Sequence, residues 1–282
     1  MVKDAAYTRI LPQGDFMVDA TQAIKPPSLL LLLLEGRAVW EYGALIASRP
    51  MLNLLPKGDG HPVLVLPGLA GTDLSTKPLR KFLESRGYTP AGWELGRNLG
   101  LREGLLEQML ERLDELYEEY GEKISIIGWS LGGIFARELA KLRPEQVRMV
   151  ITLGSPHSGN PKASNARKFY ERVSGHKVDN PPLNSRIYQA PPVPTTSIYT
   201  KTDGIVAWQN CHQAEPKNKE KARKTENIQV MGSHCGLGIN PSVLYIIADR
   251  LALREGSWTA FSNHGFRKAF FETPGFHLPQ AS

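Results

Sequence analysis

The 282-residue sequence has only two cysteines, Cys211 and Cys235, and lacks a long hydrophobic run. Two cysteines are too few for a disulfide framework. The leucine run Leu29–Leu34 is far shorter than the roughly 20 apolar residues that cross a bilayer. The first residues, MVKDAAYTRILPQGDF, lack the charged-then-apolar layout of a signal peptide. We therefore predict a cytoplasmic protein, with export left open as the alternative.

The sequence also lacks a basic surface patterned for nucleic acid. Its net charge is +6, but the one dense basic run, Lys217–Lys224, contains no aromatic residue. Nucleic-acid sites combine clustered cations with stacking aromatics, so we predict no nucleic-acid partner. Hydrophobic residues make up 41% of the chain, which is typical of a globular protein with one large core.

Apolar runs alternate with helical patterns from residue 62 onward, which predicts an α/β fold. Such alternation is typical of a mostly parallel central sheet with helices on both faces. Strands are expected at 62–68, 89–95, 123–129, 147–155, 195–201 and 227–233, and helices at 76–87, 101–120, after 130, and at 241–253. The domain so predicted spans residues 56–282.

Two segments fall outside this alternation. Residues 1–55 are predicted to form a helical extension whose helix, Ser28–Ser48, packs on the core. Contact with a lipid surface, or cover over a pocket, is the alternative for that helix. Residues 156–194 are rich in proline, asparagine and serine, and we expect a small cap or lid insertion over the carboxyl ends of the strands. The alternative is a structureless surface excursion.

The stretch KISIIGWSLGGIFARELAKL, residues 123–142, predicts a strand that turns sharply into a helix at Ser130. Gly128 and Gly132 relieve crowding around so tight a turn. The turn exposes the Ser130 hydroxyl at a helix N-terminus, where backbone N–H groups favour developing negative charge. This arrangement is typical of a nucleophile, and the alternative is a packing turn with an inert serine.

A serine nucleophile needs a base, and the base needs an orienting acid. The expected chain order is serine, acid, histidine, with the last two on loops after late strands. Asp203 follows the strand ending at 201, and His234 follows the strand ending at 233. We therefore predict Ser130, Asp203 and His234 as a catalytic triad.

The remaining site residues follow from the same reasoning. Backbone N–H groups of Leu131 and of Leu69, after the first core strand, are the candidate oxyanion donors. Four apolar residues beside the triad are candidates for the substrate pocket, with core packing as the alternative: Trp129, Ile205, Val206 and Trp208.

With these residues in place, the chain resembles the α/β-hydrolase superfamily, in particular bacterial esterases and triacylglycerol-lipase-like members. The resemblance covers about residues 62–253 and rests on GWSLGG, ITLGSPHSG, YTKTDGIVAW and GSHCGLG. It implies an eight-stranded, largely parallel sheet and ester hydrolysis through an acyl-enzyme, with no cofactor or metal. The oxyanion loop departs from the lipase pattern, because Pro67-Gly68 replaces His-Gly.

Three functions stay open at this point. The leading one is a carboxylesterase or lipase acting on a small-molecule or lipid ester. The second is acyl transfer or thioester hydrolysis by the same triad, and the third is a hydrolase fold that binds a ligand without catalysis. If Asp203 and His234 meet, Cys211 and Cys235 lie on adjoining loops, so a disulfide between them is one option and two thiols are the other.

Overall fold

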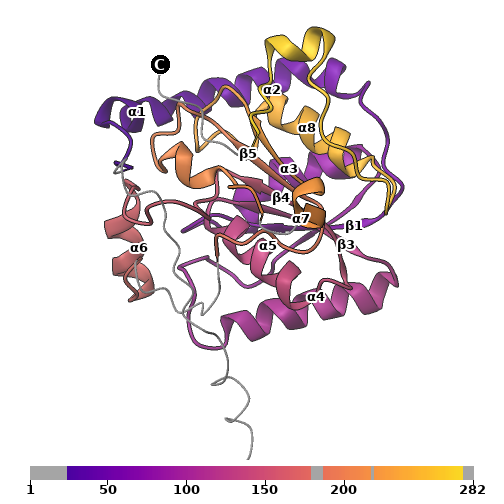
Figure 1. The fold of residues 1–282 in the computed structure, drawn as a ribbon, viewed down its shortest axis with the longest axis horizontal. Helices are drawn as coiled ribbons and strands as arrows, with labels where there is room; N and C mark the ends of the chain where they lie inside the picture. The colour runs from indigo at the N-terminus through magenta and orange to yellow at the C-terminus, as the bar shows by residue number, and fades with distance from the viewer. Residues whose placement is uncertain (1–23, 179–186, 217–218, 276–282) are drawn as a thin grey trace, which may run out of the picture.

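The computed structural model describes residues 24–178, 187–216 and 219–275 (Figure 1). Its strands are β1 (Pro62–Leu66), β2 (Thr89–Gly92), β3 (Ile124–Trp129), β4 (Val147–Leu153), β5 (Thr195–Tyr199) and β6 (Thr225–Gln229). Its helices are α1 (Leu29–Leu33), α2 (Ala38–Leu52), α3 (Asp73–Ser85), α4 (Leu105–Tyr120), α5 (Leu131–Leu142), α6 (Arg167–Ser174), α7 (Lys219–Arg223) and α8 (Pro241–Leu251). Three 3-10 helices complete the set: η1 (Leu34–Arg37), η2 (Trp208–Cys211) and η3 (Gly265–Ala269).

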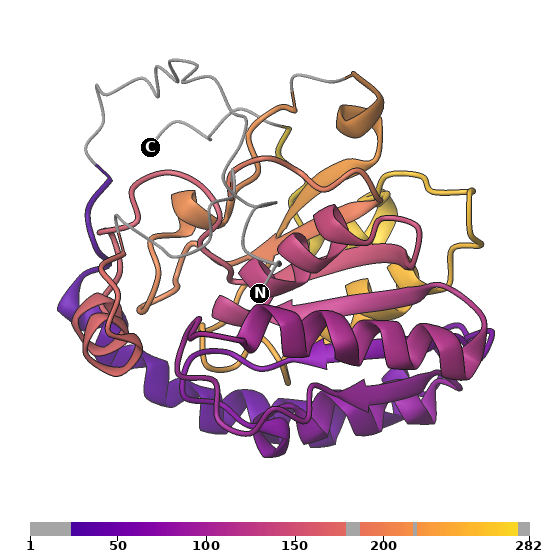
Figure 2. The ribbon, with the colours of Figure 1, turned by 90° about the horizontal axis from the view of Figure 1, so that it is seen from below.

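The six strands form one parallel sheet in the order β2-β1-β3-β4-β5-β6. Every residue of β1, β4 and β5 is buried, as expected for strands covered on both faces. One hydrophobic core joins the sheet to α2, α3 and α8, and a second joins the opposite face to α4 and α5 (Figures 1 and 2). The predicted α/β class with a parallel sheet is confirmed.

Several element bounds differ from the sequence-based expectation, and three differences are the clearest. The resemblance implied eight strands, whereas the described residues form six. Helix α3 begins at Asp73 rather than at 76, because the Thr72 side chain caps it by accepting a hydrogen bond from the Leu74 N–H. Strand β6 begins at Thr225 and ends at Gln229, so the chain before His234 is loop rather than strand.

The N-terminal segment runs through α1, η1 and α2 along one edge of the molecule (Figure 1). Leu45 and Leu52 of α2 are buried in the core beside α8, which fixes this segment to the domain. Residues 1–23 of the predicted extension lie outside the described residues. Within the described ranges, no helix combines the length and apolar character that a membrane span requires.

The predicted insertion, residues 156–194, carries the short helix α6 and lies beside the loop that follows β5. Ser164 and Val206 form an isolated antiparallel bridge between these two segments. The Asn160 and Asn165 side-chain amides donate to the carbonyls of Ile24 and Pro27, so the insertion also contacts the N-terminal segment. Residues 179–186 of the insertion lie outside the described residues.

Candidate active site

Ser130 occupies the turn between β3 and α5 with φ 53° and ψ −118°, a conformation that non-glycine residues rarely adopt. Its N–H donates to the carbonyl of Leu153 at the end of β4, at 2.8 Å. Such backbone strain is on the order of 1–3 kcal/mol and is held in place by the surrounding structure. The described residues provide no hydrogen-bond partner for its hydroxyl, which lines a cavity.

The two glycines around Ser130 are required by close backbone approach. A Cβ at Gly128 would overlap the carbonyl of Gly132, the second residue of α5. A Cβ at Gly132 would overlap the carbonyl of Leu66, at the end of β1. The G-x-S-x-G pattern therefore lets α5 start directly against the sheet, as the sequence predicted.

Asp203 and His234 meet in a buried hydrogen bond of 2.6 Å between Asp203 Oδ2 and His234 Nδ1. The other carboxylate oxygen, Oδ1, accepts from the N–H groups of Ile205 and Val206 at 2.8 and 2.7 Å. Because an ionised carboxylate only accepts, Nδ1 of the neutral imidazole carries the proton and Nε2 is free to act as a base.

His234 lies next to the elbow. The indole of Trp129, the residue before Ser130, donates to the His234 carbonyl at 3.1 Å. A Cβ at Gly154 would sit 3.0 Å from His234 Nδ1, and Gly154 directly follows Leu153, the residue that holds the Ser130 N–H. The three predicted triad residues therefore gather at the carboxyl ends of β3, β5 and β6.

The electrostatic surroundings favour the protonated form of His234. Burial by itself would lower the pKa of the imidazole, but the charge and hydrogen bond of Asp203, together with the charge of Glu35, raise it above its usual value. A base with a raised pKa is a stronger proton acceptor, and the same charges stabilise the imidazolium once formed.

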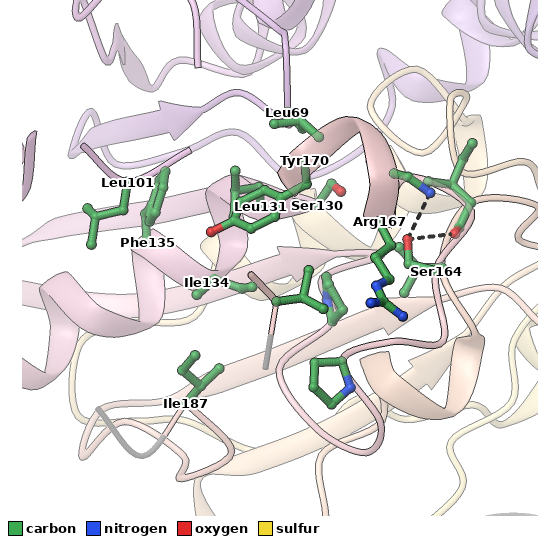
Figure 3. A pocket seen from close by; sticks show the side chains of 16 residues that line it. Leu69, Leu101, Ser130, Leu131, Ile134, Phe135, Ser164, Arg167, Tyr170 and Ile187 are labelled. Carbon is green, nitrogen blue, oxygen red and sulfur yellow. Dashed lines mark hydrogen bonds between the residues drawn. The ribbon is translucent and has the colours of Figure 1, made fainter. Parts of the chain in front are cut away.

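The predicted oxyanion loop follows β1 and lies against the elbow. A Cβ at Gly68 would be 3.3 Å from the Ser130 Cβ, so the loop passes directly beside the nucleophile. Asn98, which the sequence reading missed, fixes this loop: its side chain donates to the Pro67 carbonyl, and its own carbonyl accepts from Ala70 N–H. Ala70 has φ 61°, a second strained residue at the site. Leu69 and Leu131 both line the cavity beside Ser130 (Figure 3).

The cavity has a volume of about 140 Å³ and a mostly apolar wall. It is lined by Leu69, Leu101, Ser130, Leu131, Ile134, Phe135, Pro156, Pro161, Ser164, Ala166, Arg167, Tyr170, Val178, Ile187, Ile205 and Val206. Half of these residues come from the insertion, which therefore forms one wall of the cavity opposite α5 (Figure 3). Its polar lining residues are Ser130, Ser164, Arg167 and Tyr170, and a mainly apolar wall with a few polar groups is typical of a small-molecule site.

Two of the four predicted pocket residues line this cavity, namely Ile205 and Val206. The other two are corrected by the structure. Trp129 packs on the core with its indole turned to the His234 carbonyl, and Trp208 stacks on Tyr199 at 5.7 Å. The sequence reading missed three lining residues: Leu101 in the loop before α4, Phe135 of α5 and Tyr170 of α6.

Of the two options left open for the cysteines, the structure has the two thiols: Cys211 and Cys235 are both free, the first buried and the second exposed. Burial raises the pKa of Cys211 well above its ordinary value. Cys235 is exposed as a residue, but partial desolvation of its thiol and the neighbouring Glu35 carboxylate raise the pKa of Cys235 to about 12. Neither thiol is set up to ionise near neutral pH, so neither competes with Ser130 as nucleophile.

Glu35 is a further site residue that the sequence reading missed. Its side chain is buried among the acid and base loops, and its carboxylate accepts from the N–H groups of Gly204, His234 and Cys235. Burial by itself would raise the pKa of Glu35, but these three donors and His234 lower it below its usual value. A glutamate that closes a leucine run gives no sign of such partners in the sequence.

Comparisons with known proteins agree with this architecture. A family model described as "PGAP1-like alpha/beta domain" matches residues 94–233, a range that contains Ser130 and Asp203. A comparison with curated proteins gave no match.

Among solved structures, Aspergillus fumigatus lipase B superimposes with a TM-score of 0.54 at 16% identity, covering 70% of this chain and 53% of the lipase. MGS-MChE2, an α/β hydrolase enzyme from a sediment metagenome of the Mar Chica lagoon in Morocco, superimposes with a TM-score of 0.47 at 20% identity, covering 68% of this chain and 90% of that one. A monoacylglycerol lipase from Paleococcus ferrophilus superimposes with a TM-score of 0.48 at 16% identity, covering 69% of this chain and 96% of the lipase. The chain has the α/β-hydrolase fold.

Proposed function

We propose that the protein is a serine hydrolase that cleaves carboxylic esters through an acyl-enzyme on Ser130. The observation that carries the proposal is the buried Asp203–His234 hydrogen bond of 2.6 Å beside a strained, cavity-lining serine. A buried carboxylate–imidazole pair next to an exposed hydroxyl is the arrangement that activates a serine nucleophile. The apolar cavity favours an uncharged, fairly apolar ester as substrate.

In the first half of the reaction, His234 Nε2 takes the Ser130 proton as Oγ bonds to the ester carbonyl carbon. The carbonyl π electrons move to oxygen, and the Leu69 and Leu131 N–H groups stabilise that oxyanion by about 3 kcal/mol each. Collapse of the intermediate breaks the bond to the alcohol oxygen, which receives the proton from His234. Asp203 holds the imidazole tautomer and stabilises its cationic form.

In the second half, a water molecule attacks the acyl carbon of the ester on Ser130. His234 takes one proton from this water, and the oxyanion forms again at the same two N–H groups. When the second intermediate collapses, the bond to Oγ breaks and His234 returns the proton to Ser130. The products are a carboxylic acid and the regenerated serine.

The test combines covalent labelling with ester hydrolysis. We expect a fluorophosphonate probe to label the wild-type protein on Ser130, and p-nitrophenyl esters of increasing chain length to be hydrolysed. Ser130→Ala should remove the label and lower kcat/KM by about 10⁴-fold or more. Ser257→Ala, at an exposed serine, is the matched control. Full activity in Ser130→Ala would overturn the proposal.

Product analysis separates hydrolysis from transfer. With an added alcohol in the assay, a hydrolase releases mainly the free acid, whereas an acyltransferase forms the new ester. We expect the free acid. Predominant formation of the new ester would reassign the same triad to acyl transfer.

A further inference from the structure

Glu35 connects the two loops that carry the acid and the base. Its Oε1 accepts from Gly204 N–H at 2.7 Å and from His234 N–H at 3.1 Å, and its Oε2 accepts from Cys235 N–H at 2.8 Å. Gly204 directly follows Asp203, so a single carboxylate fixes backbone next to both members of the Asp203–His234 pair.

The same segment offers a donor for the carbonyl groups of these loops. The Arg37 guanidinium donates to the carbonyls of Thr202 and Gly232, each at 2.7 Å. Glu41, one turn further along, accepts from Ser233 N–H at 2.7 Å. The inward-facing side chains of η1 and the start of α2 are therefore complementary to the two loops. Their carboxylates accept from loop N–H groups, and the Arg37 guanidinium donates to loop carbonyls.

The acid and base loops need these hydrogen-bond partners. The loops leave the sheet at the carboxyl ends of β5 and β6, where the backbone groups around Gly204 and His234 have left the strand ladder. Buried backbone N–H groups without partners are costly, so some acceptor must reach them. A Cβ at Gly204 would overlap the Leu31 carbonyl, which shows how closely the N-terminal segment approaches the acid loop.

We propose that Glu35 is a positioning residue for the ester hydrolysis proposed above, holding the Asp203 and His234 loops at the separation that their hydrogen bond requires. The proposal rests on that function for its kinetic consequence. Its structural part, the fixed loop geometry, stands on the three hydrogen bonds alone.

The negative charge of Glu35 gives the proposal a second measurable consequence, the pH dependence of activity. The Glu35 carboxylate lies close enough to His234 to contribute to the raised pKa of the imidazole. Asp203, from the loop after β5, is the other charged group that acts on the His234 imidazole. Two more charged groups face the base loop: Arg37, which donates to the Gly232 carbonyl, and Glu41 of α2, which acts on the Cys235 thiol. Catalysis needs the neutral imidazole, so activity falls as the pH drops through this raised pKa. Removing the Glu35 charge lowers the pKa and moves the acidic limb of the pH profile to lower pH.

Two substitutions separate geometry from charge. Glu35→Gln keeps the length but loses the charge and turns an amide donor toward a backbone donor. We expect kcat to fall about 10- to 100-fold with little change in KM, and the acidic limb of kcat/KM to shift to lower pH. Glu35→Asp keeps the charge but shortens the reach, so kcat should fall while the limb stays near its wild-type position.

The matched control is Glu41→Gln, which removes a carboxylate from the same segment. Glu41 accepts from the Ser233 N–H and from the Asn240 side chain, and among the described residues it has no hydrogen bond to the acid loop. Its acidic limb should not move. An unshifted limb in Glu35→Gln, or wild-type kcat in that variant, would overturn the positioning role.

An NMR titration of the His234 imidazole tests the role of Glu35 without an activity assay. Glu35→Gln should lower the measured pKa of His234 in the folded protein, whether or not a substrate is known. If the wild-type protein hydrolysed no ester and took no fluorophosphonate label, the proposed function would fail while this titration still decided the role of Glu35.

The outward face of the same segment carries a second, independent inference. From Leu29 to Ile46 the exposed side chains are apolar or small, and none is charged, because Glu35, Arg37 and Glu41 turn inward. Leu33 is 79% exposed and Trp40 is 81% exposed. Surface helices normally expose their charges, so this inverted pattern marks an interaction surface.

A cationic groove lies beside this face, between α2 and α3. Its volume is about 480 Å³, its floor includes Leu45 and Phe82, and its lining carries Arg49, Lys77 and Lys81 but no acidic residue. An anionic lipid surface offers acyl chains and, above them, negatively charged phosphate groups. The apolar side chains, including Trp40, suit the acyl chains and the interface, and the cations of the groove suit the phosphate groups.

We infer that the outward face of residues 29–54, with the α2–α3 groove, binds the surface of a bilayer that contains anionic phospholipids. The test is co-sedimentation of the full chain with vesicles of phosphatidylcholine alone and with added phosphatidylglycerol. Binding should require phosphatidylglycerol and should weaken at least about tenfold in Lys77→Glu/Lys81→Glu and in Leu33→Ser/Trp40→Ser. Lys219→Glu is the charge control, because Lys219 is an exposed lysine on α7, beside β6 at the opposite edge of the sheet from α3.

Thermal unfolding of each variant, measured in parallel, shows that lost binding is not lost folding. Equal binding to both vesicle types would overturn the role of the groove. Absence of vesicle binding, together with a dimer in sedimentation velocity that Leu33→Ser/Trp40→Ser abolishes, would assign the face to a second copy of the chain instead.

Discussion

The elbow around Ser130 and the N-terminal segment around Glu35 reach the same site by opposite routes. The elbow is built within one continuous stretch, residues 124–142, where strand, turn and helix follow one another. Glu35 instead meets partners 169 to 200 residues away in the chain. The local sequence thus positions the backbone at Ser130. A segment far away in the chain fixes the positions of the acid and base loops relative to each other.

The two regions also differ in what a substitution disturbs. At the elbow the limiting factor is space, because backbone atoms of α5 would crowd a Cβ at Gly128, and backbone atoms of β1 and the loop after it would crowd a Cβ at Gly132. In the N-terminal segment the limiting factor is hydrogen bonding, because the side chains of Glu35, Arg37 and Glu41 bond to backbone groups of the acid and base loops. A change at the elbow should therefore act through stability, and a change in the segment through catalysis.

The largest effect is expected at the elbow for Gly132→Ala. The new Cβ would overlap the carbonyls of Leu66 and Pro67, which are backbone atoms of β1 and the oxyanion loop and cannot simply rotate away. We expect the free energy of unfolding to fall by about 3 kcal/mol or more, with hydrolysis lost. Urea denaturation followed by circular dichroism measures it.

The control for that substitution comes from the other region. A Cβ at Gly36, in η1, meets nothing within 4 Å. Gly36→Ala should therefore be neutral or should stabilise by about 0.5–1 kcal/mol, because alanine restricts the unfolded chain. A large loss of stability in Gly36→Ala, or none in Gly132→Ala, would break the contrast between the two regions.

A smaller effect is expected from Arg37→Met in the N-terminal segment. The methionine keeps the apolar stem but leaves the Thr202 and Gly232 carbonyls without their shared donor. We expect a loss of about 1–3 kcal/mol in unfolding free energy and a fall in kcat of about tenfold, since both loops lose one attachment. Steady-state kinetics on a soluble ester and thermal unfolding give the two values.

Arg254→Met, at an exposed arginine after α8, is the matched control and should change neither quantity. If Arg37→Met lowered stability but left kcat at the wild-type level, the segment would be a structural support without influence on the loops' catalytic geometry.

The same contrast explains what the sequence could predict. The alternation of strands and helices, the G-x-S-x-G turn and the Asp203 and His234 loops follow local patterns whose positions are set by a few neighbouring residues. Trp129 and Trp208 were assigned to the pocket by their place beside the triad, but their indoles turn to the His234 carbonyl and to Tyr199. Side-chain direction at a strand end depends on packing partners that no spacing reveals.

Glu35 and Asn98 were missed for a related reason. Each uses its side chain to satisfy backbone groups far along the chain, and such backbone partners leave no trace in residue types. Charged residues at the end of an apolar run are usually solvent-facing, so the inward turn of Glu35, Arg37 and Glu41 reverses the ordinary expectation.

The smallest effect is expected for Cys235→Ser, because Glu35 is bound by the backbone N–H of Cys235 rather than by its sulfur alone. Serine keeps a hydroxyl donor at the same place, and the thiol, with a pKa of about 12, supplies no thiolate at neutral pH. We expect kcat/KM to stay within about twofold and the acidic limb of the pH profile to stay in place. Titration of the denatured, unreduced wild-type protein should find two thiols, and the variant one. A single substitution that silences the enzyme here would mean that the sulfur, and not the backbone held by Glu35, aligns the base loop.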